Sequence, residues 1–173
     1  DFLENFPDAP GPEDWLKAKR LCAVEPAAPW SVIAITFTNK AAGELKERLE
    51  RMCGPASKDI WAATFHRACI RILRRDIEKL GAGFNSNFTI YDSDDSKRVI
   101  RDVIKALSLD EKEFNPRSVM TVISNAKDKN QSPDQFAQDS RNARDWRMPR
   151  VAEIYAGYDR RLREANALDF DDI

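Results

Sequence analysis

The chain has 173 residues, 42% hydrophobic and 33% charged, and its 28 Lys and Arg nearly balance its 29 Asp and Glu. This balance argues against a strongly basic nucleic-acid arm, a polybasic membrane anchor and an acidic disordered tail. The sequence has no apolar run near the roughly 20 residues of a membrane span. Its three cysteines and single histidine also disfavour a Cys/His zinc site. We therefore expect a helix-rich globular chain in the reducing cytoplasm, with no membrane partner and no metal site.

The chain is expected to begin with a tail and a short helix. Residues 1–12 are rich in proline and show little periodicity, which is typical of a loop. A helix is predicted from Pro12 or Glu13 to Leu21, with proline in its first turn. The apolar run over residues 31–37 then predicts a strand that is buried on both faces of a parallel sheet.

Two strand–helix units follow from this point. Thr38 and Asn39 supply capping oxygens for a helix that Gly54 ends, and its apolar stripe comprises Ala41, Ala42, Leu45, Leu49 and Met52. A second strand over residues 60–64 leads directly into a helix that ends at Gly81. This order predicts an α/β unit with a parallel sheet. Two strands cannot complete such a sheet, so we expect the chain to be part of something larger.

From about residue 88 the pattern predicts helices alone. Asp92 is expected to cap one helix, with Asp95 at the spacing of a capping box. Further helices are expected to begin at Asn115-Pro116, Ser132-Pro133 and Met148-Pro149. Residues 88–166 are therefore predicted to form a separate helical subdomain.

Polar and aromatic side chains follow both predicted strands. Phe37, Thr38 and Asn39 come after the first strand, and Thr64, Phe65 and His66 end the second. Ligands of open α/β sheets bind at the carboxyl ends of the strands, helix N-termini attract phosphate, and an aromatic face stacks on any base. Adjacent parallel strands would place the two groups side by side, as one nucleic-acid track. The alternative is that these residues are ordinary helix caps and core aromatics.

Several segments together resemble one family. The segment Thr36-Phe-Thr-Asn-Lys-Ala-Ala-x-Glu-Leu-x-x-Arg48 resembles motif Ia of the UvrD/Rep/PcrA-type superfamily-one DNA helicases, and Thr64-Phe-His66 resembles their motif Ib. Further similarity, in order and spacing, lies in Ile90-Tyr-Asp-Ser-Asp-Asp95, Ser124-Asn-Ala-Lys127 and Leu168-Asp-Phe-Asp-Asp172. The resemblance covers about residues 15–173.

This resemblance implies a fold and a domain organisation. Members of the family are ATP-driven motors that move 3′→5′ on single-stranded DNA and separate duplexes with two RecA-like domains. The chain is then an α/β remnant of a RecA-like parallel-sheet motor domain plus an all-α helical insert, helical overall. Residues 1–14 would be a tail, 15–87 part of the first motor domain, 88–166 the helical insert, and 167–173 a return to the motor domain before the Walker B motif.

The resemblance also implies site residues and partners. Phe37, Thr38, Asn39, Thr64, Phe65 and His66 would line the path of the single strand. Lys127 is a further candidate for a backbone contact, although its interpretation as an ordinary solvated lysine is favoured. Single-stranded and forked DNA are the expected partners, together with a second motor domain that this sequence does not contain.

The sequence departs from the family pattern at the ATP site. It contains no Walker A loop, G-x-x-x-x-G-K-[ST], which cradles the phosphates of ATP. ATP and Mg²⁺ are thus the expected cofactors of the parent protein and not of this chain, which we expect to be catalytically inactive. Asp169 is predicted to be a helix cap with Asp172 three residues on, and not a magnesium ligand. The alternative functions are a non-catalytic DNA-binding or a protein-binding helical module.

Overall fold

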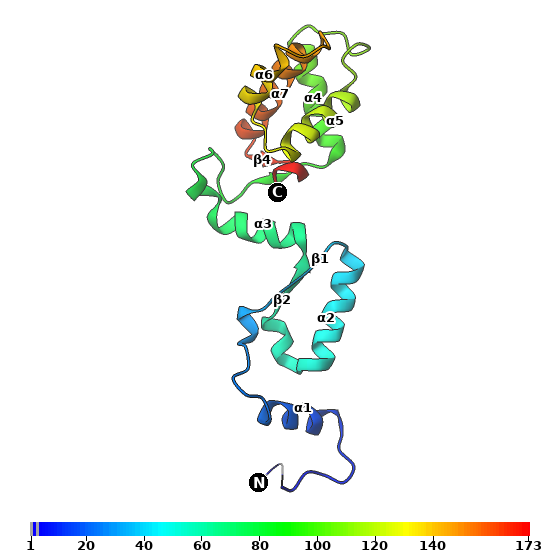
Figure 1. Cartoon of the computed structure of the whole chain (residues 1–173), viewed down its shortest axis with the longest axis vertical. Helices are drawn as coiled ribbons and strands as arrows, with labels where there is room; N and C mark the ends of the chain where they lie inside the picture. Colours follow the sequence, from blue (N-terminus) through cyan, green and yellow to red (C-terminus); the bar gives the residue numbers. More distant parts are fainter. Residues whose placement is uncertain (1, 3) are drawn as a thin grey trace. The chain divides into compact units, whose positions relative to one another are not determined.

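The computed structural model describes residue 2 and residues 4–173 (Figure 1). The chain divides into two compact units, unit 1 over residues 1–69 and unit 2 over residues 70–173. Among the described residues, no helix combines the length and the apolar character needed to cross a bilayer.

Unit 1 is built around a two-stranded parallel sheet. Its elements in chain order, with η marking 3-10 helices, are α1 (Pro12–Leu21), η1 (Pro29–Ser31), β1 (Ile33–Thr36), α2 (Asn39–Cys53), η2 (Gly54–Asp59), β2 (Trp61–Thr64) and the first residues of α3 (Phe65–Asp76). In the β1–β2 pair, Ile33 lies opposite Trp61 and Thr36 opposite Thr64. The predicted strand–helix order and the parallel pairing of the two strands are therefore confirmed.

The two strands of unit 1 are buried to different extents. Ala62 and Ala63 of β2 are buried, and α2 packs on both strands and buries its own Ala42. By contrast, Ile33 and Ile35 of β1 are 54% and 49% exposed. The prediction that this strand is buried on both faces is wrong. Alternate side chains of a strand share a face, and the face that carries Ile33 and Ile35 is largely open to solvent.

Unit 2 contains a helical bundle. The short strands through which the chain enters and leaves this bundle pair with each other. After α3 its elements are η3 (Ile77–Leu80), β3 (Thr89–Ile90), α4 (Ser93–Ala106), α5 (Pro116–Asp128), α6 (Pro133–Ser140), α7 (Met148–Glu164), β4 (Ala167–Leu168) and η4 (Phe170–Asp172). β3 and β4 pair in parallel, with Thr89 opposite Ala167. The prediction of helices alone after residue 88 is corrected by β3. Two residues are too short to produce a visible alternation of apolar side chains.

The core of unit 2 lies between α4, α5 and α7. Its most deeply buried side chains, all at most 1% exposed, include Ile100, Ile104, Ile154, Tyr158 and Leu162. Each aliphatic side chain buried in this way contributes about 1.5–3 kcal/mol relative to full exposure. A smaller core of Ile77, Phe88 and Leu168 fixes the β3–β4 pair next to η3.

Local capping explains where the helices of unit 2 begin. The Asp92 carboxylate accepts hydrogen bonds from the backbone N–H groups of Asp94 and Asp95 at 2.8 and 2.9 Å, as the capping-box spacing predicted. Asn115 and Ser132 cap α5 and α6 in the same way, each followed by proline. The predicted helix ending at Gly81 tightens into η3 after Asp76, and Gly81 then takes the left-handed conformation, with φ of 62°.

Candidate nucleic-acid interface

Six of the predicted site residues come together at the carboxyl ends of β1 and β2. We call Phe37, Thr38, Asn39, Thr64, Phe65 and His66 the strand-end cluster. Because Thr36 lies opposite Thr64, the residues that follow each strand leave the sheet from adjacent positions, about 4.8 Å apart in the direction of the hydrogen bonds. The prediction that the two groups of residues lie side by side is therefore confirmed. Binding of nucleic acid by the cluster stays a prediction.

Hydrogen bonds around Thr38 fix the backbone of the cluster. The Thr38 hydroxyl accepts a hydrogen bond from the N–H of Ala41 at 3.2 Å and so caps α2. The Thr36 hydroxyl donates to the carbonyl oxygen of Thr38, also at 3.2 Å. On the neighbouring strand, the Thr64 hydroxyl accepts from the N–H of Arg67 at 3.4 Å. The two threonines of the cluster thus act as helix caps, which holds the residues around them in place.

The aromatic side chains of the cluster face solvent. Phe37 is 94% exposed and Phe65 is 47% exposed, which is unusual for phenylalanine. The rings of Phe65 and His66 meet edge to face, with centroids 6.1 Å apart and planes at 89°. The alternative interpretation of these phenylalanines as core residues is therefore wrong for Phe37. Open aromatic faces of this kind stack on unpaired bases.

The charges beside the cluster are positive. Lys40, directly after Asn39, has a side chain that is 89% exposed and lies 3.9 Å from Glu44 on the next turn. Arg67, directly after His66, is exposed as well. The cluster itself carries no carboxylate and no thiol. Its composition therefore suits binding of an anionic, base-bearing ligand and does not suit acid–base or nucleophilic catalysis.

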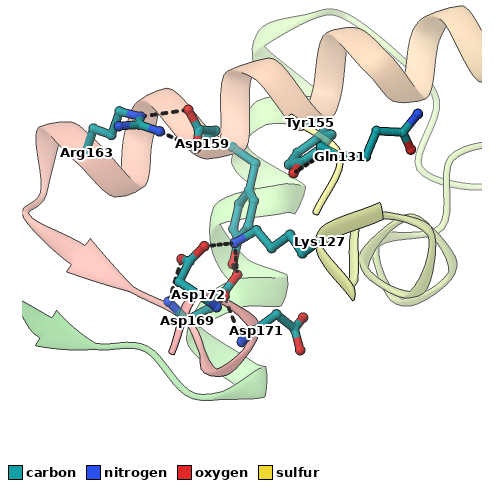
Figure 2. A network of polar contacts seen from close by, with 9 residues as sticks. Lys127, Gln131, Tyr155, Asp159, Arg163, Asp169, Asp171 and Asp172 are labelled. Carbon is teal, nitrogen blue, oxygen red and sulfur yellow. Dashed lines mark hydrogen bonds and ion pairs between the residues drawn. The ribbon is translucent and has the colours of Figure 1, made fainter. Parts of the chain in front are cut away.

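The seventh predicted residue, Lys127, lies in a buried polar network of unit 2 (Figure 2). Its ammonium group donates to Asp169 Oδ2 at 2.6 Å and to Asp172 Oδ1 at 2.7 Å, and its side chain is only 7% exposed. The interpretation of Lys127 as a solvated lysine is wrong. Its contact with a DNA backbone stays a prediction that this packing disfavours, because two carboxylates already neutralise the ammonium charge.

Asp169 is the centre of this network. Its Oδ2 also accepts a hydrogen bond from the Tyr158 hydroxyl at 2.8 Å, and its Oδ1 accepts from the backbone N–H groups of Asp171 and Asp172 at 3.0 Å. The Asp172 carboxylate accepts from the N–H of Asp169 in return, so the predicted helix cap with its capping box is confirmed. The Tyr158 and Lys127 contacts were not predicted, because nothing in the local spacing indicates them.

The ionisation of the network follows from burial and from the three charges. Burial lowers the pKa of Lys127, but the charges of Asp172 and Asp169 outweigh it and raise that pKa above 10.5. Burial raises the pKa of Asp169, but attraction to Lys127 and hydrogen bonds from Lys127 and Tyr158 bring it below 3.8. Burial and the neighbouring Asp169 charge raise the pKa of Asp172. Burial also raises the pKa of Tyr158, so its hydroxyl stays protonated and able to donate.

Solvent-accessible space borders the network on one side. A pocket of about 220 Å³ beside it is lined by Asp92, Ser93, Ser96, Met120, Thr121, Ile123, Ser124, Asn125, Tyr158, Asp169, Phe170 and Asp171. Two of the acidic side chains there, Asp92 and Asp169, are already engaged as helix caps. Among the described residues, no group of three or more His, Cys, Asp or Glu side chains is arranged to hold a metal ion.

Comparison with known proteins gives a consistent result. Residues 17–173 match the sequence profile of the UvrD/REP helicase N-terminal domain. The chain is 46% identical over 153 residues to the ATP-dependent DNA helicase PcrA of Bacillus subtilis (strain 168), covering 88% of this chain and 20% of the relative. It is 46% identical over 146 residues to the protein of that name from Staphylococcus aureus (strain Mu50 / ATCC 700699), and 44% identical over 146 residues to that of Staphylococcus epidermidis (strain RP62A). In both, the match covers 84% of this chain and 19% of the relative, so the chain spans about a fifth of the length of these relatives.

Proposed function

The chain belongs to the UvrD/REP helicase N-terminal domain family, and from this membership we propose that it is part of an ATP-dependent DNA helicase. Residues 15–87 are part of the first motor domain in this proposal, residues 88–166 form its helical insert, and residues 167–173 return to the motor domain. The whole protein moves 3′→5′ along single-stranded DNA and separates duplexes. Forked DNA and a second motor domain are its further partners.

In this proposal ATP and Mg²⁺ act outside these 173 residues. The sequence contains no G-x-x-x-x-G-K-[ST] loop, and the carboxylates of Asp169 and Asp172 are engaged by Lys127 and by the backbone. The contribution of this chain to the motor is therefore to hold the nucleic acid.

The strand-end cluster contacts the single strand. The observation that carries this assignment is the exposure of Phe37 and Phe65 after two strand ends that lie in adjacent positions of one parallel pair. Phe37 offers a stacking face, and the first turn of α2 and Lys40 provide N–H groups and positive charge for phosphate. Because stacking tolerates every base, the contact follows the strand without reading its sequence.

Fluorescence anisotropy of labelled oligothymidylate with the purified chain tests this assignment. Replacing Phe37 by Ala removes the stacking face and weakens binding by about 1–3 kcal/mol, and Phe37→Trp retains it. Met52→Ala is the matched control, because Met52 is 56% exposed and lies at the other end of α2, about 20 Å from Asn39. Equal affinities of the Phe37→Ala and Met52→Ala variants would show that the strand-end cluster does not contact the single strand.

A further inference from the structure

A second surface rich in arginine and aromatic character lies between α6 and α7 of unit 2. We call residues 141–150 the Arg/Trp segment. Its charged and aromatic members are Arg141, Arg144, Asp145, Trp146, Arg147 and Arg150. The segment thus carries four cations and one carboxylate within ten residues. None of these residues belongs to the strand-end cluster or to the Lys127 network.

The side chains of the segment face solvent. Trp146 is 68% exposed, and its indole N–H donates to no described residue. The side chains of Arg147 and Arg150 are 49% and 55% exposed. Tryptophan buries most of its area in folded proteins, so an indole this open is available to a ligand.

Two of the four arginines have no partner in the described chain. Arg147 makes a two-point contact with Asp145, at 3.0 Å through Nε and 2.8 Å through Nη2, and Arg150 donates to Glu153 at 2.8 Å. Arg141 and Arg144 are exposed and form no ion pair and no side-chain hydrogen bond with described residues. The segment therefore carries two guanidinium groups whose hydrogen-bonding capacity is unused.

Backbone hydrogen bonds hold the Arg/Trp segment in place. The N–H of Ala143 donates to the carbonyl oxygen of Ser140 at 3.2 Å, and the N–H of Met148 donates to that of Asp145 at 3.0 Å. Beneath it α6 packs against α7, where the rings of Phe136 and Tyr155 meet edge to face at 5.9 Å. The first turn of α7 contains no acidic side chain, and the carboxylates next to the segment are those of Asp145 and Glu153, which pair with Arg147 and Arg150.

These features define the chemistry of a partner. Arginine forks pair with phosphate, and an open indole stacks on a base that is not already stacked in a duplex. A protein partner would require a larger apolar patch than one tryptophan among charged side chains. We propose that the Arg/Trp segment binds single-stranded nucleic acid, with Arg141 and Arg144 on phosphates and Trp146 stacked on a base. This inference rests on the proposed function, and it places a second contact on the helical unit.

Residue-resolved NMR separates this contact from the strand-end cluster. In the ¹⁵N-labelled chain titrated with a short oligothymidylate, the indole N–H signal of Trp146 and the amide signals of residues 141–147 are expected to shift. The Trp146→Phe variant assigns the indole signal among the four tryptophans. Shifts at residues 37–39 report the strand-end cluster independently. An indole signal that stays in place while residues 37–39 shift would overturn the inference and leave the proposed function intact.

Binding measurements with matched variants add a quantitative test. For the double variant Arg141→Gln/Arg144→Gln, the slope of log Kd against log salt concentration is expected to fall by about 1.4, since each lost single-strand phosphate contact contributes about 0.7. Trp146→Ala is expected to weaken affinity about fivefold or more, and Trp146→Phe to retain most of it. The control is Arg98→Gln/Arg160→Gln, which removes the same charge; Arg160 lies about 15 Å further along α7 than Arg150.

Each outcome decides the inference. A smaller slope of log Kd against log salt concentration in Arg141→Gln/Arg144→Gln, with an unchanged slope in Arg98→Gln/Arg160→Gln, supports the inference. Equal losses in both variants would mean a general effect of net charge, and no change in either would mean that the segment makes no contact, so both results overturn it. Tighter binding of a hairpin duplex than of the single strand, with the same dependence on Arg141 and Arg144 but none on Trp146, would overturn it in favour of duplex binding.

Discussion

The Lys127 ammonium group and the Asp169 carboxylate lie 2.6 Å apart although 42 positions separate the two residues in the sequence. This ion pair ties α5 to the capped turn η4 at the end of unit 2. Asp172 and Tyr158 complete the contact, so that every buried polar atom of the described side chains has a hydrogen-bond partner. The network therefore determines how the last residues of the chain lie against the helical bundle.

Replacing Lys127 by Met should destabilise unit 2 by about 3–5 kcal/mol, because it leaves two buried carboxylates without their counter-ion. The measurement is the free energy of unfolding from urea titration followed by circular dichroism. Lys129→Met is the control, since Lys129 is exposed two residues further on and makes no ion pair with described residues. A Lys127→Met variant as stable as this control would mean that the network contributes no net stability.

The stability of unit 2 should fall in acid through Asp169. Its pKa is held below 3.8 in the folded chain by Lys127 and the hydrogen bonds, against the effect of burial. A lowered pKa gives stability that is present above the unfolded value and is lost as pH falls through the folded value. The difference in unfolding free energy between wild type and Asp169→Asn should therefore be constant above about pH 5 and shrink below pH 3.8. A difference that is independent of pH down to pH 2 would contradict this account.

Gly157 permits the close approach of α7 to α4. A Cβ at this position would lie 2.7 Å from Cγ1 of Val103, which is buried in the core. Gly157→Ala should therefore cost about 1–3 kcal/mol in overpacking, of which the better helix propensity of alanine offsets about 1 kcal/mol. In a Val103→Ala background the same substitution should be neutral or stabilising. Thermal unfolding of wild type, the two single variants and the double variant measures the coupling between the two positions. Additive changes in stability would show that the contact with Val103 does not cause the destabilisation by Gly157→Ala.

Gly43 provides the opposite case in α2. It lies in the helix interior, and a Cβ there would meet nothing within 4 Å. Gly43→Ala should stabilise unit 1 by about 0.5–1 kcal/mol, because glycine loses more backbone entropy in a helix than alanine does. Amide hydrogen exchange within α2 is the measurement. Slower exchange supports the expectation, and faster exchange would mean that Gly43 packs against a neighbour.

ATP turnover by the 173-residue polypeptide should be indistinguishable from a buffer control. The reason is the absence of a G-x-x-x-x-G-K-[ST] loop from the sequence. A coupled phosphate-release assay measures it, with single-stranded DNA added to stimulate any motor activity. Turnover that follows the protein through a second chromatographic step would show that the chain binds nucleotide by another route.

Features with a local cause were predictable from the sequence. Asp92, Asn115 and Ser132 cap helices because a short oxygen-bearing side chain reaches N–H groups two or three residues ahead, and that spacing is visible in the sequence. The side-by-side position of the Phe37 and Phe65 segments followed from strand–helix order, which leaves parallel pairing as the natural arrangement.

Features that depend on distant residues were not predictable in the same way. β3 and β4 are each two residues long, and the helices α4 to α7 separate them in the sequence. The partners of Lys127 come from a turn near the end of the chain, and no periodicity connects α5 to that turn. The exposure of Ile33 and Ile35 was not predicted. An apolar run indicates that a strand tends to be buried, but it does not show whether another element packs on that strand.

The pairing of β3 with β4 determines how the helical bundle can vary. The chain enters the bundle after Ile90 and returns at Ala167 in a neighbouring strand that runs in the same direction. A two-residue turn can join antiparallel strands, whereas parallel strands need a crossover of about a dozen residues or more. The helices from α4 to α7 are therefore one very large crossover connection. The connection between these two strands therefore cannot be shortened to a tight turn without separating them.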